Sequence, residues 1–191
     1  MTPIIEFKNY TFKYRSQSEP TLRDIDLRVN PGEKGLSVGP SGSGKSTLVH
    51  CINGMVPFSY PGESSGTLTV GGKDPAKTGI FGMSKIVGTV LQDTDGQFIG
   101  LTVAEDVAFA LENDCVEQEE MFRAVDEVAE VVDIKALLGN APTELSGGQK
   151  QRVSMAGVLV DDVDILLFDE PLANLDPATG KRAIDLIDRI C

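Results

Sequence analysis

The chain has 191 residues, of which 41% are hydrophobic and 24% are charged, a balance typical of a folded protein with an apolar core. Its 29 acidic and 17 basic side chains give a formal net charge of −12, which excludes a general nucleic-acid binder because such a protein needs a basic surface. No stretch approaches the roughly 20 apolar residues that span a bilayer. Three cysteines without paired or metal-like spacing predict reduced thiols.

The N-terminal part of the chain predicts strands followed by a helix. Two series of β-prone positions are separated by a polar turn, and a Pro-Gly turn precedes a third, short apolar run. A Gly-rich loop leads into the helix, and the next segment is rich in Pro, Gly and Ser. We expect strands over 4–14, 22–29, 36–38 and 67–70, and a helix from Lys45 to about Gly54.

The remaining sequence alternates strands with helices. Thr102 and Glu105 form a capping box, in which a hydroxyl and a carboxylate satisfy free amides at a helix start. The expected elements are strands over 86–91 and 163–168, and helices over about 102–112 and 117–138 and from Ser146. A final helix is expected over 177–190, with Ile184, Ile187 and Ile190 on one apolar side. This alternation predicts an α/β domain with a largely parallel sheet.

The Gly-rich segment 39–47 matches the pattern G-x-x-x-x-G-K-[ST] between the expected strand and helix. Glycines let backbone amides turn toward an anion, and the helix adds its positive N-terminal end. We expect Lys45 to reach the β- and γ-phosphates of a nucleotide and Ser46 to bind Mg²⁺. The predicted nucleotide-binding residues of this loop are Gly39, Pro40, Ser41, Gly42, Ser43, Gly44, Lys45, Ser46 and Thr47.

Two carboxylates follow the apolar run that ends at Phe168. Asp169 can hold Mg²⁺ beside the phosphates, and Glu170 can polarise the attacking water as a general base. An apolar run that ends in two acids is a weak signal on its own. The phosphate loop in the same chain favours the catalytic interpretation.

A second glycine-containing motif follows, composed of Leu145, Ser146, Gly147, Gly148 and Gln149. With the Lys-Gln-Arg that comes next, it resembles the signature of ABC ATPases, and its serine is expected to cap a helix whose first amides form another anion site. The resemblance covers the whole chain, 1–191. It implies a P-loop NTPase fold of the ABC ATPase type, with an N-terminal β subdomain and a helical signature subdomain over about 93–155. In that family the signature faces the ATP of a second ATPase subunit, in a head-to-tail dimer.

Further positions match the ABC family one at a time. Gln92 resembles the residue that senses Mg²⁺ and the γ-phosphate. The resemblance therefore implies a metal site formed by Ser46, Gln92 and Asp169. The catalytic groups that it implies are Glu170, Lys45 and Gln92. Asp176 resembles a residue that reaches across the dimer. Tyr14 resembles the aromatic residue that stacks on adenine, although Tyr10 and Phe12 are close and one of these rings must belong to the core.

The segments Val90–Phe98 and Thr102–Phe109 resemble those of energy-coupling-factor ATPases, which drive uptake of vitamins and of cobalt or nickel ions. This implies an importer subunit that uses ATP and Mg²⁺ and lies peripherally on the cytoplasmic face of the cell membrane. The implied partners are a second ATPase subunit or domain, a transmembrane coupling protein and a substrate-binding membrane component, with no nucleic acid. We expect the coupling protein to dock around Gln92–Phe98 and the helix from Thr102.

Two alternatives remain open. One is a non-transport ABC ATPase that acts on ribosomes or DNA, although the acidic middle of the chain lacks the basic insertions of such proteins. The other is an ATP-binding fragment without turnover. Members of the family carry a catalytic His one strand beyond the loop that contains Asp176, and this chain stops at Cys191, before that strand. The His of this chain, His50, is expected on a helix surface and cannot take that role. We therefore expect a C-terminally incomplete domain, in which Gly35 weakens the strand that follows it.

Overall fold

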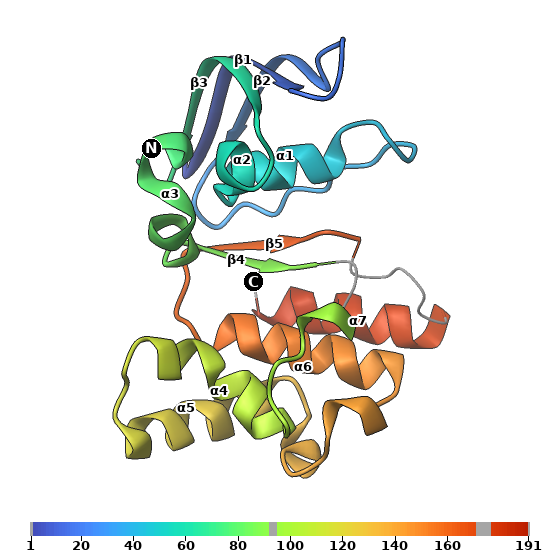
Figure 1. The fold of residues 1–191 in the computed structure, drawn as a ribbon. Helices are drawn as coiled ribbons and strands as arrows, with labels where there is room; N and C mark the ends of the chain where they lie inside the picture. The colour runs from blue at the N-terminus through green and yellow to red at the C-terminus, as the bar shows by residue number, and fades with distance from the viewer. Residues whose placement is uncertain (1, 92–94, 171–176, 191) are drawn as a thin grey trace. The chain divides into compact units, whose positions relative to one another are not determined.

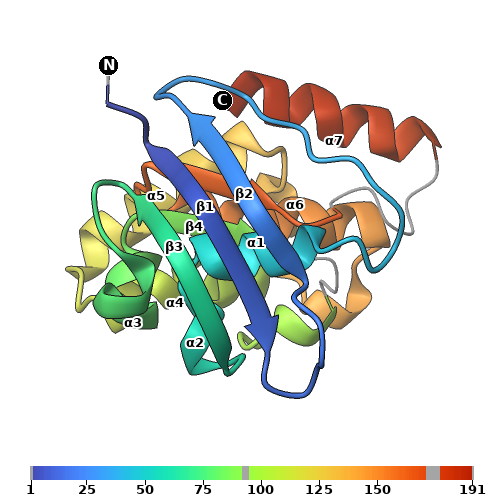
Figure 2. The same ribbon diagram turned by 90° about the horizontal axis from the view of Figure 1, so that it is seen from above.

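Three antiparallel strands form the sheet of an N-terminal unit, Met1–Val87. The computed structural model describes residues 2–91, 95–170 and 177–190. β1 (Ile5–Tyr14) lies between β2 (Leu22–Val29) and β3 (Gly62–Val70) and pairs with both (Figure 2). The strands predicted over 4–14, 22–29 and 67–70 are therefore confirmed, and β3 begins earlier than its apolar residues indicate.

Three helices complete this unit. α1 (Lys45–Ile52) and α2 (Met55–Phe58) lie along one face of the sheet (Figure 1), and α3 (Pro75–Ser84) follows β3. The Tyr10 hydroxyl donates a hydrogen bond to the Cys51 Sγ at 3.7 Å, which joins β1 to α1. Burial raises the pKa of the Cys51 thiol to about 11. The apolar face of β1 and the end of α1 thus form the core of the unit.

The segment before the phosphate loop corrects the prediction of a strand over 36–38. Residues 33–40 have no regular secondary structure, and Leu36 and Val38 are 90% and 83% exposed. A β-prone sequence becomes a strand only where a neighbouring strand and a packed face support it. Within the described part of the chain no strand pairs with this segment, and Gly35 raises the entropic cost of ordering it.

The C-terminal unit, Gly88–Cys191, combines a two-stranded sheet with four α-helices in its described residues. β4 (Val87–Val90) pairs with β5 (Ile165–Phe168) across a long stretch of intervening chain. The helices are α4 (Val103–Asn113), α5 (Gln118–Val131), α6 (Gly147–Leu159) and α7 (Pro177–Ile190), with short 3₁₀ turns at Asp95–Gln97, Lys135–Leu137 and Pro142–Glu144. All of the helices and strands expected here are present.

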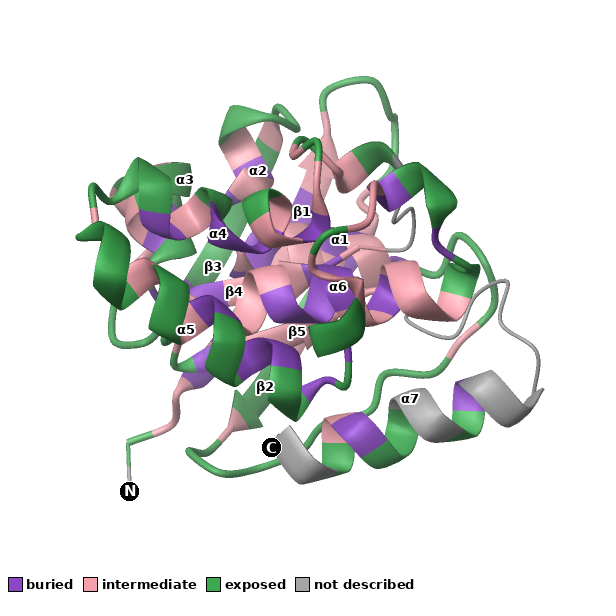
Figure 3. Cartoon of the chain, turned by 90° about the horizontal axis from the view of Figure 1, so that it is seen from below, coloured by how far each residue is buried: buried purple, intermediate pink, exposed green. Residues whose placement is uncertain are grey.

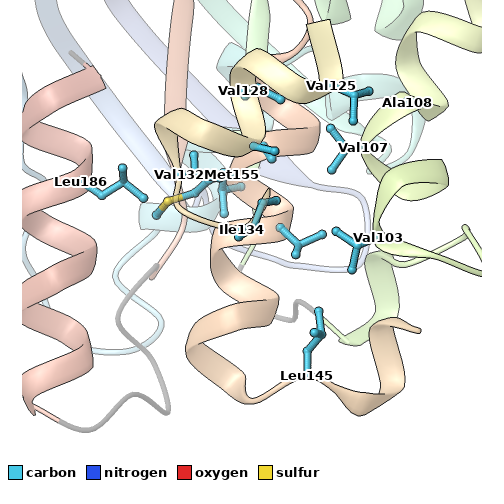
Figure 4. Close-up of a cluster of buried hydrophobic side chains, with 14 residues drawn as sticks. Val103, Val107, Ala108, Val125, Val128, Val132, Ile134, Leu145, Met155 and Leu186 are labelled. Atoms are coloured by element: carbon cyan, nitrogen blue, oxygen red, sulfur yellow. The ribbon is translucent and has the colours of Figure 1, made fainter. Parts of the chain in front are cut away.

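An apolar cluster holds these helices together. Val103 and Val107 come from α4, Val128 from α5, Met155 from α6 and Leu186 from α7 (Figure 4). All five are at most 8% exposed, so the cluster is a continuous core. Buried residues gather along α6, whose central part lies inside the unit (Figure 3). Among the helices of the described ranges, none has the length and hydropathy to span a bilayer.

α5 is shorter than the helix predicted over 117–138. It ends at Val131, and Asp133 adopts a left-handed conformation with φ of 57°. The Ile134 amide donates to the Ala129 carbonyl at 2.8 Å and the Asp133 amide to the Glu130 carbonyl at 3.2 Å. This is the Schellman pattern that ends a helix, and Ile134 is then buried beside it.

α7 has the predicted bounds but a different buried face. Leu186 is only 3% exposed, whereas Ile184, expected on the apolar side, is 46% exposed. Ile187 packs partly against the cluster, as expected. The side chain of Ile190 lies outside the described residues.

Candidate functional site

The phosphate loop leads directly into α1. Gly44 precedes the helix in a left-handed conformation with φ of 96°, which only glycine adopts readily, and it has no side chain to cap the helix. A Cβ atom on Gly44 would also lie 3.2 Å from the Thr21 carbonyl oxygen. The first turn of α1 contains no acidic residue. These features fit an anion, because the helix N-terminus carries partial positive charge and no acidic residue of the first turn competes for it.

Lys45 folds back over the loop. Its Nζ donates hydrogen bonds to the Gly39 carbonyl oxygen at 3.0 Å and to the Pro40 carbonyl oxygen at 3.1 Å. The ammonium group therefore lies over the same backbone that would surround phosphates. Phosphate oxygens are stronger acceptors than carbonyls because they are charged, so the residues present fit a nucleotide phosphate. Ser46 follows in the first turn of the helix, as expected for a Mg²⁺ ligand.

The three neighbouring aromatic residues of β1 separate into core and site. Tyr10 and Phe12 are 7% and 0% exposed and belong to the core, whereas Tyr14 is only partly buried. The Tyr14 hydroxyl lies 2.9 Å from the Thr47 hydroxyl of α1, within hydrogen-bonding distance. Tyr14 is therefore the ring of the three that is placed to meet a base, and its role in stacking remains a prediction.

One aromatic neighbour of the phosphate-loop helix was missed from the sequence. Tyr60 stacks on His50 with ring centroids 4.3 Å apart and meets Tyr14 edge-on at 6.3 Å. His50 thus lies on α1 against an aromatic ring rather than simply on a helix surface. The sequence held no signal for this contact, since Tyr60 follows a turn-rich segment that indicated only a loop.

The two acids after β5 have distinct backbone settings. The Asp169 amide donates to the Val90 carbonyl oxygen at 2.9 Å, which ties the end of β5 to β4. Glu170 is exposed and has a left-handed φ of 51°, an uncommon conformation for a residue with a side chain. Such outliers cluster at functional sites, and this one turns the chain sharply after the strand. Gln92 and Asp176 lie outside the described residues.

The signature residues form a self-capped helix start. The Ser146 Oγ accepts from the Gln149 amide at 3.4 Å, and the Gln149 Oε1 accepts from the Ser146 amide at 2.8 Å. Leu145 is buried and anchors the motif, whereas Ser146 and Gly147 are exposed. A Cβ atom on Gly147 would meet nothing within 4 Å, so the fold of the unit does not require glycine there. Gly147 instead leaves the amides of the first turn, including that of Gly148, open to a group from outside the helix.

The phosphate loop and Tyr14 thus belong to the N-terminal unit, and the acids and the signature belong to the C-terminal unit. Within the described ranges, each predicted site residue lies on the helix, strand or loop that the sequence predicted for it. The strand expected over 36–38, before the phosphate loop, is the element that is not formed. Their roles in binding and catalysis remain predictions.

Comparisons with known proteins identify the family. Residues 22–173 match the family model described as ABC transporter. Two relatives have provisional names that describe ABC transporter ATP-binding proteins. The one from Streptococcus mutans is 60% identical over 100% of this chain. The one from Enterococcus faecalis is 64% identical over 98% of this chain. These matches cover 34% and 33% of the relatives, so the chain spans about a third of their length.

A solved structure gives the same result. CbiO1 from Clostridium perfringens, part of the ABC transporter complex CbiONQ, superposes with a TM-score of 0.88 at 30% sequence identity. The match covers 100% of this chain and 74% of that one. The α/β fold is therefore that of ABC ATPases, with a β-rich N-terminal part and helices around the signature. By its family match and its fold, this chain belongs to the ABC transporter family.

Proposed function

We propose that the chain is the ATP-binding and ATP-hydrolysing part of an ABC importer of the energy-coupling-factor type. The observation that carries this proposal is the presence of two glycine-containing helix starts suited to anions, at α1 and α6. A chain needs only α1 for the phosphates of its own nucleotide. The exposed start of α6 is then available to the ATP of a second ATPase subunit or domain, in a head-to-tail dimer.

Each site residue has a role in this proposal. The loop from Gly39 to Thr47 wraps the phosphates, Lys45 places its positive charge on the β- and γ-phosphates, and Tyr14 stacks on the base. Ser46, Gln92 and Asp169 would hold Mg²⁺, and the bound ion would supply positive charge beside the phosphates. Glu170 takes the proton of the attacking water. Asp176 contacts the other half of the dimer.

The importer subtype is supported by the sequence around β4 and α4 and by the likeness to CbiO1, which is part of a CbiONQ complex. We propose a peripheral position on the cytoplasmic face of the membrane, bound to a transmembrane coupling protein that works with a substrate-binding membrane component. The helical subdomain, about 93–155, would carry the contact with the coupling protein. The net charge of −12 disfavours the alternative of a ribosome- or DNA-associated ATPase.

The test of this function is Glu170→Gln in the full-length protein that carries this chain. The change keeps the shape of the side chain and removes the base, so we expect MgATP affinity within about twofold of wild type. Hydrolysis should fall by about 10²-fold or more, and the ATP-bound dimer should persist longer in size-exclusion chromatography. Glu120→Gln, on the exposed surface of α5, is the matched control. Wild-type phosphate release by the Glu170 variant would reject the proposed catalytic role.

A further inference from the structure

Three rings form a continuous contact from α1 to the end of β1. The His50 ring, in the last turn of α1, stacks on Tyr60 with centroids 4.3 Å apart and planes 12° apart. Tyr60, which follows α2, meets the Tyr14 ring edge-on at 6.3 Å and 82°. Stacked and edge-to-face pairs are favoured geometries of aromatic side chains. These three residues, which we call the aromatic triad, therefore connect the phosphate-loop helix to the ring proposed to stack on the base.

Tyr14 is also held at two other points. Its hydroxyl lies 2.9 Å from the Thr47 hydroxyl in the first turn of α1. Its ring meets the buried Phe12 ring edge-on at 4.9 Å. Tyr60 adds a contact from the segment before β3, so the Tyr14 ring meets side chains from three separate parts of the unit. Tyr60 itself is 37% exposed, so its ring is not one of the core side chains.

Backbone hydrogen bonds fix Tyr60 beside Tyr14. The Tyr60 amide donates to the Met55 carbonyl oxygen at 3.2 Å, which ties it to α2. The Arg15 amide donates to the Pro61 carbonyl oxygen at 3.0 Å. Because Arg15 follows Tyr14 and Pro61 follows Tyr60, this hydrogen bond joins the neighbours of the two rings. The contact between the rings is thus set by the backbone as well as by the side chains.

The close pairing of β1 and β3 requires glycine at this place. Gly62 lies opposite Tyr14 in the register of the two strands. A Cβ atom on Gly62 would overlap the Lys13 carbonyl oxygen and the Phe12 ring, so a side chain there would push β3 away. Tyr14 is the last residue of β1, where the strand pairing ends. A ring at such a position samples several rotamers unless neighbouring side chains hold it.

We propose that Tyr60 is a positioning residue for base binding, which holds the Tyr14 ring in the orientation that stacks on the base of a nucleoside triphosphate, and that His50 supports Tyr60. The inference rests on the proposed nucleotide function and names two residues that determine how much the base adds to affinity. A ring that is already ordered loses less conformational entropy on stacking than one that rotates freely. The aromatic triad therefore strengthens binding without touching the nucleotide beyond Tyr14.

Tripolyphosphate separates base binding from phosphate binding. It carries phosphates without a base, so the ratio of MgATP affinity to magnesium tripolyphosphate affinity reports what the base and its sugar add. In Tyr60→Leu we expect calorimetry of the full-length protein to show about fivefold weaker MgATP binding, the size of one aromatic pair, and tripolyphosphate binding within about twofold of wild type. Tyr60→Phe keeps the ring and should keep the wild-type ratio. Phe58→Leu, at an exposed aromatic residue of α2, is the matched control.

A fluorescent base tests the orientation of the ring directly. An aminopurine analogue of ATP is quenched when its base stacks on an aromatic ring, so its fluorescence at saturation reports the stacking itself. We expect about twofold weaker quenching by Tyr60→Leu than by wild type or Tyr60→Phe, because a disordered ring stacks for less of the time. His50→Leu should give intermediate quenching, and His50→Phe, which keeps a flat ring against Tyr60, should match wild type.

The outcomes separate this inference from the proposed function. Equal losses of MgATP and tripolyphosphate affinity in Tyr60→Leu, or a wild-type ratio and wild-type quenching in that variant, would overturn the positioning role. If Tyr60→Leu does not fold, the two His50 variants decide, because unequal quenching supports the aromatic triad and equal quenching overturns it. A wild-type protein that binds neither ligand would instead reject the proposed function and this inference with it.

Discussion

Two of the helix starts that contain glycine, those of α1 and α6, are built in opposite ways. α1 has no side-chain cap, begins after a left-handed Gly44, and carries the charge of Lys45. α6 is capped by Ser146 and Gln149 in a reciprocal box and has no acidic residue in its first turn. The first amides of α1 have no side-chain acceptor from the helix start itself, whereas the start of α6 supplies its own acceptors.

This difference indicates how the two sites are used. A helix start without a cap leaves its amides to a ligand, so under the proposed function the α1 loop and its nucleotide would depend on each other. A capped start keeps its shape whether or not a ligand is present. We infer that α6 is ready to meet a phosphate that arrives from outside the chain, and that α1 is organised by a phosphate that it retains. The following changes test that contrast.

Replacement of the charge at α1 should have the largest effect. Lys45→Ala removes hydrogen bonds from an ammonium to phosphate that are worth about 3 kcal/mol, so MgATP affinity should fall by about 10²-fold. Isothermal calorimetry of the full-length protein measures it, with Lys77→Ala, 84% exposed on α3, as control. If the Lys45 variant keeps both its affinity and its turnover, the assignment of the phosphate loop is wrong.

A side chain at the start of α6 should act on turnover rather than on binding. Gly147→Val places a branched side chain where the fold leaves open space, and it would block an approaching phosphate. We expect hydrolysis to fall about tenfold, the cost of one charge-assisted hydrogen bond, with MgATP affinity within about twofold of wild type. Gly139→Val, at another open glycine, is the control. Equal effects of the two valines on hydrolysis would remove the case for a signature site.

The self-capping of α6 predicts a smaller effect, on stability. Ser146→Ala removes the acceptor for the Gln149 amide and should lower the free energy of unfolding by about 1 kcal/mol. Ser146→Asn, which retains a capping oxygen, should restore most of that loss. Urea unfolding followed by circular dichroism measures both variants. A stability of the alanine variant equal to wild type would show that the box contributes nothing, and the contrast with α1 would then be invalid.

Features set by neighbouring residues could be predicted from the sequence. The capping box at Thr102 and the serine cap at Ser146 need only positions three residues apart, and both are confirmed. The phosphate loop likewise precedes the helix that its pattern predicts. In each case the interacting groups lie within one turn of chain, so the sequence contains the whole interaction.

Features set by distant residues could not be predicted. The end of α5 is fixed where Arg152 donates to the carbonyl and the carboxylate of Asp133, from a helix 19 residues away. The run at 36–38 has the composition of a strand, but a strand also needs a partner for its backbone. The choice of Tyr14 among three rings, and the exposure of Ile99 beside a packed Phe98, likewise depend on tertiary packing.

The burial of Cys51, which lies on α1 and contacts Tyr10 of the sheet, has a consequence for chemical labelling. Its thiol is 1% exposed and has a pKa raised to about 11, so at neutral pH it is both shielded and protonated. Cys115, between α4 and α5, is exposed. With Cys191 replaced, a maleimide fluorophore would therefore attach selectively at Cys115. The chain thus carries a built-in attachment point for a reporter on its helical part, and the nucleotide-loop helix stays unmodified.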